Sequence, residues 1–264
     1  MNMIIGLQMY TLRKHMNSKE EVFESLKKVA AIGYQQVQIS VPAFMTVEEL
    51  KAMLDEVGLK ADSSMCYVMK ASESQEEFDK VIHNAEVLGT KTIRLDGMPK
   101  DMAQTPNGFK GYAAILDRLG RRFYEAGYTM YYHFHAFEWI NFGPESRGID
   151  ILLNETDPKY VNFQPDVFWL TSAGTEASVS LRKFEGRAKY MHVKDYAVKA
   201  RTGALEDIPN SFASVGYGNL NWPGIIKTAT EIGIEQFVVE QDQCDGDEFE
   251  AIAESYKNLR KFGV

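Results

Sequence analysis

The chain has 264 residues, of which 45% are hydrophobic and 25% charged, and its formal net charge is −8. This is the composition of an ordinary globular protein, and no apolar run approaches the roughly 20 residues that a membrane-spanning helix needs. The negative charge argues against nucleic acid as a partner, and two cysteines, Cys66 and Cys244, are too few for a disulfide framework.

The N-terminal stretch "MNMIIGLQMYTLRK" lacks both a basic leader and a small-residue cleavage site. It therefore does not read as a secretory signal, and we expect a cytoplasmic location. We expect no membrane partner, and the sequence leaves assembly into a homo-oligomer open.

Short runs with β-strand character alternate with amphipathic helical segments along the chain. The expected strands are residues 3–9, 35–40, 60–65, 91–95, 129–135, 161–166, 189–193 and 236–241. The helical segments 18–33, 46–58 and 74–89 each place apolar residues on one face and end in glycine, a common helix stop. Since parallel neighbours need crossover connections, eight such units predict an α/β fold, a (β/α)8 TIM barrel formed by a single domain of residues 1–264. A doubly wound open sheet is the alternative, but no glycine-rich fingerprint follows the first strand.

Polar residues stand at the end of every expected strand. In a barrel the catalytic groups lie at the carboxyl ends of the strands, and polar groups left unpaired there would cost several kcal/mol. Paired residues two positions apart face the same way. In chain order these residues are Gln8 and Tyr10, Gln38, Ser64 and Cys66, Arg94 and Asp96, His133 and His135, Gln164 and Asp166, His192 and Lys194, and Glu240 and Asp242.

Four residues near the last four strand ends are of the types that bind divalent metal ions. Glu138, Asp166, His192 and Glu240 come from successive strands, and we expect them to converge on one point. Such a mixed oxygen and nitrogen set suits one Mn²⁺, Mg²⁺, Co²⁺, Fe²⁺ or Zn²⁺ ion. Taken singly, each residue is more often a helix cap, an ion-pair partner or a core residue. The combination of four predicts a site.

A set of ordered motifs spans nearly the whole chain. They are "GLQMYTLR" (6–13), "YHFHAFEW" (132–139), "FQPDVFWL" (163–170), "MHVKDY" (191–196), "VGYGNLNWPGII" (215–226), "VVEQD" (238–242) and "SYKNLRKFG" (255–263). Together they resemble the xylose isomerase-like barrels, the sugar phosphate isomerase/epimerase group that includes tagatose-type epimerases and inosose dehydratases. The resemblance implies one divalent metal held by residues of strands five to eight, with Asp166, His192 and Glu240 as ligands.

The fifth-strand motif departs from the best-studied epimerases, whose glutamate stands earlier, at about position 132 or 133. This chain has histidines in that stretch, and its glutamate follows at 138. A closer subgroup has a "YHNHDFEF"-like motif, in which Phe134 here replaces the asparagine. The fourth ligand is therefore expected to be Glu138, with His135 or His133 as alternatives. Gln38 also stands where many relatives carry a glutamate.

These residues predict the removal of a proton next to a carbonyl. A metal that chelates a sugar's carbonyl and neighbouring hydroxyl polarises the carbonyl and stabilises an enediolate. His135 is the expected base because neutral imidazole titrates near neutral pH, and Glu240 is expected to return a proton. Glu138 completes the expected catalytic set as a ligand. We expect an isomerase or epimerase; a lyase or dehydratase acting on a keto-sugar, keto-glycoside or inosose is the alternative.

Other residues near the strand ends are candidates for binding a small sugar or sugar derivative. Lys194 is expected to contact a hydroxyl or a developing oxyanion, or to pair with Asp195 instead, and the aromatic residues serve equally well as core. The expected substrate-binding residues are His133, Lys194, Tyr10, Gln8, Trp169 and Arg94. No glycine-rich phosphate cradle is evident, so a phosphorylated substrate is not implied.

Two other functions fit a barrel of this kind less well. An apurinic endonuclease needs a positive face, which the net charge of −8 opposes. A non-catalytic sugar-binding barrel would leave the four metal positions dispensable. Residues 198–222 form a long connection after the seventh strand, and long loops at a catalytic face are often lids.

Overall fold

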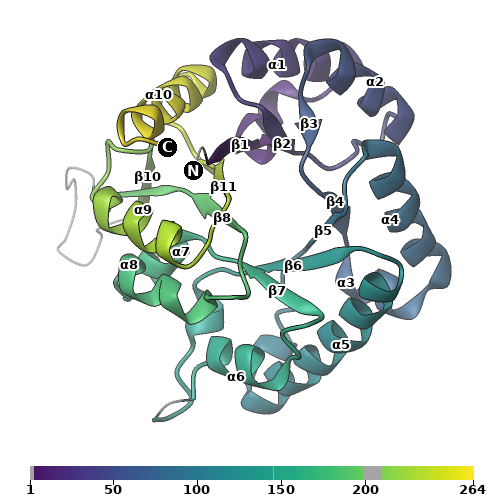
Figure 1. Cartoon of the computed structure of the whole chain (residues 1–264), viewed down its shortest axis with the longest axis vertical. Coiled ribbons are helices and arrows are strands. Elements are labelled where there is room, and N and C mark those ends of the chain that lie inside the picture. Colours follow the sequence, from purple (N-terminus) through teal and green to yellow (C-terminus); the bar gives the residue numbers. More distant parts are fainter. Residues whose placement is uncertain (1–2, 145, 199–209) are drawn as a thin grey trace.

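The strands form a ring that the helices surround (Figure 1). The computed structural model describes residues 3–144, 146–198 and 210–264. Five strands run in the order β3-β2-β1-β11-β8 and four in the order β4-β5-β6-β7, and the pairs within both sheets are parallel. The expected TIM barrel is confirmed. The barrel strands are β1 (Ile4–Gln8), β2 (Gln36–Gln38), β3 (Lys60–Ala61), β4 (Ser64–Cys66), β5 (Thr92–Leu95), β6 (Thr129–His133), β7 (Val161–Gln164), β8 (Tyr190–Val193) and β11 (Gln236–Val239).

Two joints separate the two sheets around the ring. The expected third strand is divided into β3 and β4, because its first half pairs with β2 and its second half with β5. Between the halves, the carbonyl of Asp62 accepts a hydrogen bond from the Thr90 hydroxyl at 2.8 Å. At the other joint β7 meets β8 through an isolated bridge between Asp166 and His192. Pro165 lies there; it has no N–H to donate, but its carbonyl accepts a hydrogen bond from the backbone N–H of His192 at 2.8 Å.

The helices begin and end where the sequence carries capping residues. Ser18 and Thr46 accept backbone hydrogen bonds at the starts of α1 and α2, and Gly33 ends α1 in the left-handed conformation with φ of 116°. The three helices expected from the sequence are present as α1, α2 and α4. The helices are α1 (Lys19–Ile32), α2 (Val47–Val57), α3 (Val68–Glu73), α4 (Gln75–Leu88), α5 (Pro106–Glu125), α6 (Gly148–Glu155), α7 (Val167–Ser172), α8 (Ala177–Ser180), α9 (Trp222–Glu231) and α10 (Glu248–Lys261), with 3-10 turns η1 (Met9–His15), η2 (Met102–Gln104), η3 (Phe137–Trp139) and η4 (Leu181–Phe184).

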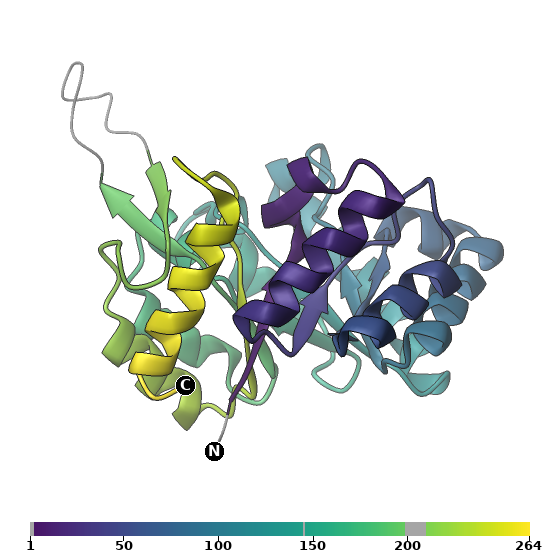
Figure 2. The ribbon, with the colours of Figure 1, turned by 90° about the horizontal axis from the view of Figure 1, so that it is seen from above.

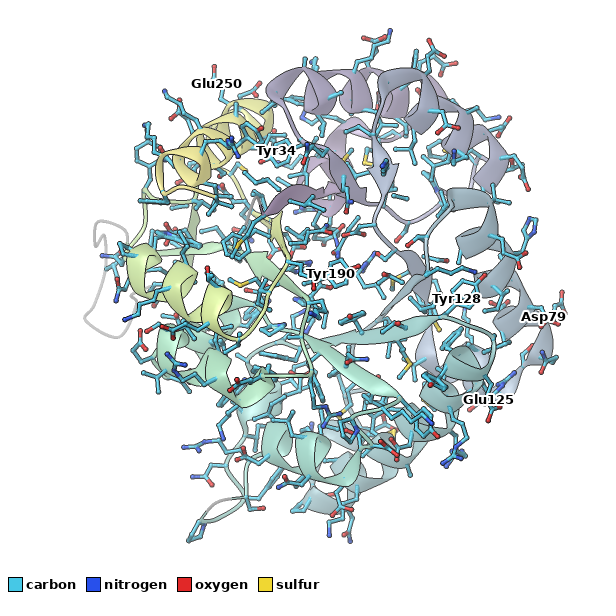
Figure 3. The ribbon with its side chains drawn as sticks, in the orientation of Figure 1. Tyr34, Asp79, Glu125, Tyr128, Tyr190 and Glu250 are labelled. Carbon is cyan, nitrogen blue, oxygen red and sulfur yellow. The ribbon has the colours of Figure 1, made fainter. Side chains whose placement is uncertain are left out.

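The main core lies between the ring of strands and the helices. Leu26 and Leu50 on the helices and Phe237 on β11 are fully buried, and burying each such side chain stabilises the fold by about 1.5–3 kcal/mol. Asp79 and Glu125 lie on the outer rim of the helices (Figure 3). No helix in the described ranges is long and apolar enough to cross a membrane.

An antiparallel hairpin follows β8. Its strands are β9 (Asp195–Val198) and β10 (Asn210–Ala213). The hairpin stands above the end of the barrel opposite the N-terminus, which is the end where the parallel strands have their carboxyl ends (Figure 2). Residues 199–209, the middle of the connection that the sequence suggests as a lid, lie outside the described residues.

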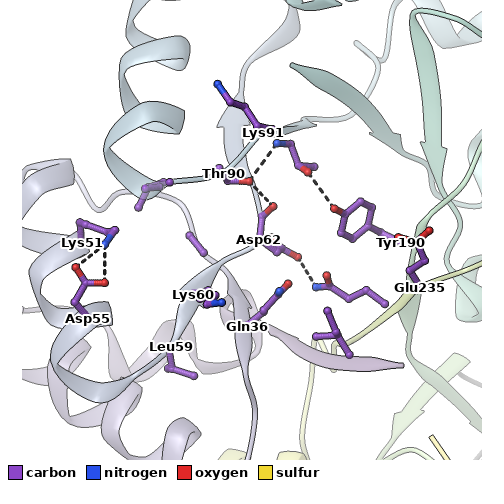
Figure 4. Close-up of a pocket in the computed structure, with 16 residues that line it drawn as sticks. Gln36, Lys51, Asp55, Leu59, Lys60, Asp62, Thr90, Lys91, Tyr190 and Glu235 are labelled. Atoms are coloured by element: carbon purple, nitrogen blue, oxygen red, sulfur yellow. Dashed lines mark hydrogen bonds and ion pairs between the residues drawn. The ribbon is translucent and has the colours of Figure 1, made fainter. Parts of the chain in front are cut away.

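A cavity of about 490 Å³ lies at the amino ends of the strands (Figure 4). Its buried carboxylate belongs to Asp62, which accepts hydrogen bonds from Gln236 Nε2 at 2.9 Å and from the Ser63 hydroxyl at 2.7 Å. Burial raises the pKa of Asp62 to about 6. In TIM barrels this face usually contributes to stability, whereas catalysis takes place at the opposite face.

The raised pKa of Asp62 predicts a pH-dependent stability. The fold favours the protonated carboxyl, so its contribution is fully present below the ordinary pKa near 3.8 and is lost as pH rises through about 6. Asp62→Asn mimics the protonated form. We expect the variant to match the wild type at pH 4 and to exceed its unfolding free energy at pH 8, by up to about 3 kcal/mol. Urea unfolding at both pH values measures this, and an equal difference at the two would contradict it.

Candidate metal centre and catalytic pocket

The carboxyl ends of the strands enclose a pocket of about 510 Å³. Most of the site residues expected from the sequence line it. These are Gln8, Tyr10, Arg94, His133, His135, His192, Lys194 and Glu240. Asp166 and Trp169 do not line the pocket but contact it, Asp166 through His133 and Trp169 through the ring of His135. The strand-end pattern thus brings together residues from distant parts of the chain.

Four of these side chains form a compact cluster. One ligand atom from each of His133, Asp166, His192 and Glu240 lies within 4.8 Å of the others. Nδ1 of His192 is 3.0 Å from Oε2 of Glu240, and Nε2 of His133 is 3.3 Å from Oδ2 of Asp166. Three of the four are the ligands expected from the sixth, seventh and eighth expected strands, and the fourth is a fifth-strand histidine.

Asp166 is held by the start of α7. Its Oδ1 accepts hydrogen bonds from the backbone N–H groups of Phe168 at 2.9 Å and Trp169 at 3.3 Å, as a helix N-cap does. Its Oδ2 is left to face the cluster. Burial alone would raise the pKa of Asp166, but the ammonium of Lys194 and the neighbouring imidazoles hold it well below the ordinary value. Asp166 is therefore a carboxylate, the form that binds a metal.

His192 is oriented by an amide. Its Nε2 lies 2.7 Å from Oε1 of Gln38, which also accepts a hydrogen bond from Gln8 at 3.2 Å. With a proton on Nε2, the lone pair of Nδ1 points toward the carboxylates. Burial alone would lower the pKa of His192, but the charges of Glu240 and Asp166 outweigh it and raise the pKa. Gln38 was not among the expected site residues, although its place at the end of the second strand marked it as a polar strand end.

The fifth-strand member of the cluster is His133, and Glu138 does not belong to it. Glu138 sits in η3, fully buried, where it accepts hydrogen bonds from the Tyr132 hydroxyl at 2.5 Å and from the backbone N–H of His135 at 2.9 Å. Burial raises the pKa of Glu138 to about 8, so the carboxyl is mostly neutral at pH 7 and is a poor ligand. Among the described residues the geometry therefore favours His133, one of the stated alternatives, over Glu138 as the fifth-strand partner, and the ligand assignment stays a prediction.

The cluster fits a divalent ion in size and in chemistry. Ligands about 2.1 Å from an ion stand about 3 to 4.2 Å apart. His192 Nδ1 lies 3.0 Å from Glu240 Oε2 and 3.7 Å from Asp166 Oδ2, and all four ligand atoms lie within 4.8 Å of one another, close to this range. Among the described residues, His192 Nδ1 and Glu240 Oε2 are buried and meet ion-pair partners, but neither has a hydrogen bond of good geometry. Two imidazoles and two carboxylates replace the three carboxylates and one imidazole expected, and this set favours Zn²⁺, Fe²⁺, Co²⁺ or Mn²⁺ over Mg²⁺.

His135 lies beside the cluster, on the pocket wall. Its ring centroid is 4.8 Å from that of His133 and 5.2 Å from that of Trp169. Burial lowers the pKa of His135, so its imidazole is neutral and able to accept a proton. Burial likewise lowers the pKa of His133, to about 3, which keeps its nitrogen lone pair available to a metal.

Lys194 reaches the cluster from the end of β8, two residues after His192. Its buried ammonium lies 2.8 Å from Glu240 Oε2, 3.3 Å from Asp166 Oδ2 and 2.9 Å from Asp242 Oδ2. Burial alone would lower the pKa of Lys194, but the three carboxylates raise it above the ordinary value. The pairing with Asp195 that the sequence suggests is not among these three ion pairs, and the suggested contact with substrate stays a prediction.

Asp195 faces the opposite way and organises the segment that follows the hairpin. Its carboxylate accepts hydrogen bonds from the backbone N–H groups of Gly216 at 2.8 Å and Gly218 at 3.0 Å, and from the indole N–H of Trp222 at 2.7 Å. A Cβ on Gly218 would lie 2.3 Å from this carboxylate, so glycine is required there. The segment 215–222 is thereby fastened to the end of β8.

Residues 26–262 match the family model described as a xylose isomerase-like TIM barrel. The inosose dehydratase of Lacticaseibacillus casei is 24% identical over 274 residues, which cover 91% of this chain and 90% of that protein. A sugar phosphate isomerase/epimerase from Parabacteroides distasonis superposes with a TM-score of 0.78 at 22% identity, covering 98% of this chain and 94% of its own. The probable 3-DHS dehydratase of petrobactin synthesis from Bacillus anthracis gives 0.69 at 14% identity, covering 98% and 99%. At these identities the structural likeness shows the fold.

The cluster predicts different metal contents for two fifth-strand variants. His133→Gln removes an imidazole ligand, so we expect the protein purified without chelator to lose most of its metal. Glu138→Gln keeps an oxygen that can accept from the backbone N–H of His135, and its NH2 group can donate to the Tyr132 oxygen, so its metal content should equal that of the wild type. Elemental analysis measures both. Metal lost in Glu138→Gln and kept in His133→Gln would return Glu138 to the ligand set.

Proposed function

The chain belongs to the xylose isomerase-like TIM barrel family, and from this premise we propose that it is a metal-dependent enzyme that removes the proton next to the carbonyl of a small sugar or sugar derivative. The observation that carries the proposal is the cluster of His133, Asp166, His192 and Glu240 with the neutral imidazole of His135 beside it. A metal site and a base on one pocket wall are what carbonyl-directed proton transfer needs.

The four clustered residues hold the ion in this proposal. A bound divalent ion would supply Lewis acidity, polarising the carbonyl so that the neighbouring proton becomes removable. Gln38 contributes by orienting His192, and the start of α7 by orienting Asp166. Their effect is to keep the ligand atoms in place before substrate arrives.

His135 is the proposed base. Its Nδ1 is buried without a hydrogen-bond partner among the described residues, and its low pKa keeps the imidazole neutral at pH 7. Glu240, expected to return the proton, pairs with Lys194 and His192, and although burial opposes this, their charges lower its pKa. A carboxylate with a lowered pKa is rarely protonated near neutral pH and has no proton to return, so we propose Glu240 as a ligand first.

The pocket supports a small polyhydroxylated substrate. Its volume of about 510 Å³ lies within the range of small-molecule sites. Gln8 and Arg94 present hydrogen-bonding groups in it, and Nε of Arg94 is buried without a partner among the described residues. Tyr10, more than half exposed at the rim, offers a face on which a sugar ring can pack.

Isomerisation or epimerisation is the first candidate outcome, because it needs only that the abstracted proton be returned. Dehydration is the second, and the curated relatives named inosose dehydratase favour it. In that case the electron pair left by the proton expels a hydroxyl from the next carbon, and water is released. Both outcomes begin with the same proton removal.

We expect proton exchange with solvent to reveal this common step. Manganese-loaded protein is incubated with ketosugars and with inososes in D₂O and followed by NMR. Deuterium entering next to the carbonyl without loss of water indicates an isomerase or epimerase, and a product lacking a hydroxyl indicates a dehydratase. If no compound in a broad panel of keto-sugars and inososes exchanges, the proposal is wrong.

The same assay tests the base. His135→Gln should keep the metal, and its rate of solvent-proton exchange should fall by a factor of about 10²–10⁴, the usual effect of removing a general base. His83→Gln is the matched control, because His83 lies on the outside of α4, where it pairs with Glu48. Unchanged exchange in His135→Gln would remove His135 from this role.

A further inference from the structure

Lys194 contacts the same carboxylate oxygens that face the metal site. Its ammonium lies against Oδ2 of Asp166 and Oε2 of Glu240, and these are the atoms that stand 3.7 Å and 3.0 Å from Nδ1 of His192. A third carboxylate, that of Asp242, accepts a hydrogen bond from the ammonium at 2.9 Å and does not belong to the cluster. The cation thus has one partner outside the metal site and two inside it.

We propose that Lys194 is the resident counter-cation of the metal site: it holds Asp166 and Glu240 in ligating positions before a metal binds, and it is retained by Asp242 when a divalent ion takes its place against them. The inference rests on the metal site of the proposed function. It assigns Lys194 and Asp242 as positioning residues that set the affinity of the site for metal.

Burial makes a counter-cation necessary. Asp166 is fully buried and Glu240 nearly so, and two carboxylates this close would repel each other strongly in a medium that screens poorly. The rings of Trp169 and Phe212 lie 5.2 Å and 5.9 Å from the Lys194 ammonium and limit the water that could screen the charges. A tethered ammonium removes this repulsion, so the site stays assembled without an ion.

The same contact must weaken metal binding. A positive charge within 3.3 Å of two ligand oxygens repels an incoming divalent ion and competes for those oxygens. Asp242 reduces this competition because it offers the ammonium a partner on the side away from the cluster. Lys194 and Asp242 together therefore keep the site assembled without metal and still allow a metal to bind.

The test measures Mn²⁺ binding by isothermal titration calorimetry on protein stripped with EDTA, together with thermal unfolding of the stripped and loaded forms. Lys194→Met should bind Mn²⁺ at least about tenfold more tightly than the wild type. Its stripped form should melt at a lower temperature than the stripped wild type. Adding Mn²⁺ should raise its melting temperature by more than it raises that of the wild type. If the stripped variant does not fold, Lys194→Gln, which keeps a polar head without the charge, takes its place.

Asp242→Asn tests independently whether Asp242 retains the Lys194 ammonium when a metal binds. With Lys194 present, losing Asp242 should weaken Mn²⁺ binding at least about threefold, because the ammonium then has only the metal ligands as partners. In the Lys194→Met background the same change should have little effect, since the pair acts as a unit. If Asp242→Asn weakens Mn²⁺ binding equally in both backgrounds, Asp242 acts on the ion directly, and its proposed role in retaining Lys194 is overturned.

Lys189→Met is the matched control, because Lys189 lies just before β8 and pairs with Glu235 at the surface. It makes the same charge change at the other end of the strand and should leave the dissociation constant within about twofold. If the wild type binds neither Mn²⁺ nor Zn²⁺, the metal site of the proposed function fails. If the wild type binds Mn²⁺ and Lys194→Met binds it equally or more weakly, the counter-cation inference alone is overturned.

Discussion

The carboxylate of Asp166 is the constraint on which the rest of the site depends. One oxygen caps α7 and the other faces the metal cluster, so the side chain cannot rotate without uncapping a helix, at a cost of about 1 kcal/mol. The same residue forms the bridge to His192 that joins β7 to β8. The residue at this joint of the barrel therefore also supplies a side chain of the cluster, and so does its bridge partner His192.

Around Asp166 the pocket is a balance of buried charges and neutral imidazoles. Ionised Asp166 and Glu240 are compensated by Lys194, whereas burial keeps His133 and His135 uncharged. Such an arrangement contributes little to folding, because desolvation offsets most of the attraction between the charges. The stability has to come from the apolar layer between strands and helices, which leaves the site free to satisfy chemistry. Uncharged imidazoles supply lone pairs, which both metal binding and proton removal require.

Much of this architecture could be predicted because it follows from local periodicity. The strand runs, the glycine stops and the polar residues two apart placed Asp166, His192 and Glu240 at successive strand ends, and the structure brings these three together. The identity of the fifth-strand partner depends on geometry that spacing does not encode. The 3-10 turn η3 folds Glu138 back beneath β6, where the Tyr132 hydroxyl and burial make it a neutral structural group.

Two other features could not be predicted from the sequence, for a related reason. The division of the third strand into β3 and β4 comes from a change of pairing partner, and a run of β-like residues looks the same whichever neighbour it pairs with. The role of Gln38 depends on His192, which is 154 residues away in the chain. Interactions of this kind become visible only when the strands are side by side.

The hydrogen bonds of Asp195 have a consequence for how this barrel can diversify. The two strands of the hairpin pair from Asp195 with Ala213 to Val198 with Asn210. The carboxylate of Asp195 fastens residues 216–222 to the end of β8. The described ends of this segment, residues 195–198 and 210–222, are thus fastened to the end of β8 by contacts in which none of the four clustered side chains takes part. Because Lys194 and Asp195 are adjacent but face opposite ways, the hairpin strands and the cluster are held by different side chains. The hairpin is therefore a place at this end of the barrel where new specificity can be acquired while the cluster is kept.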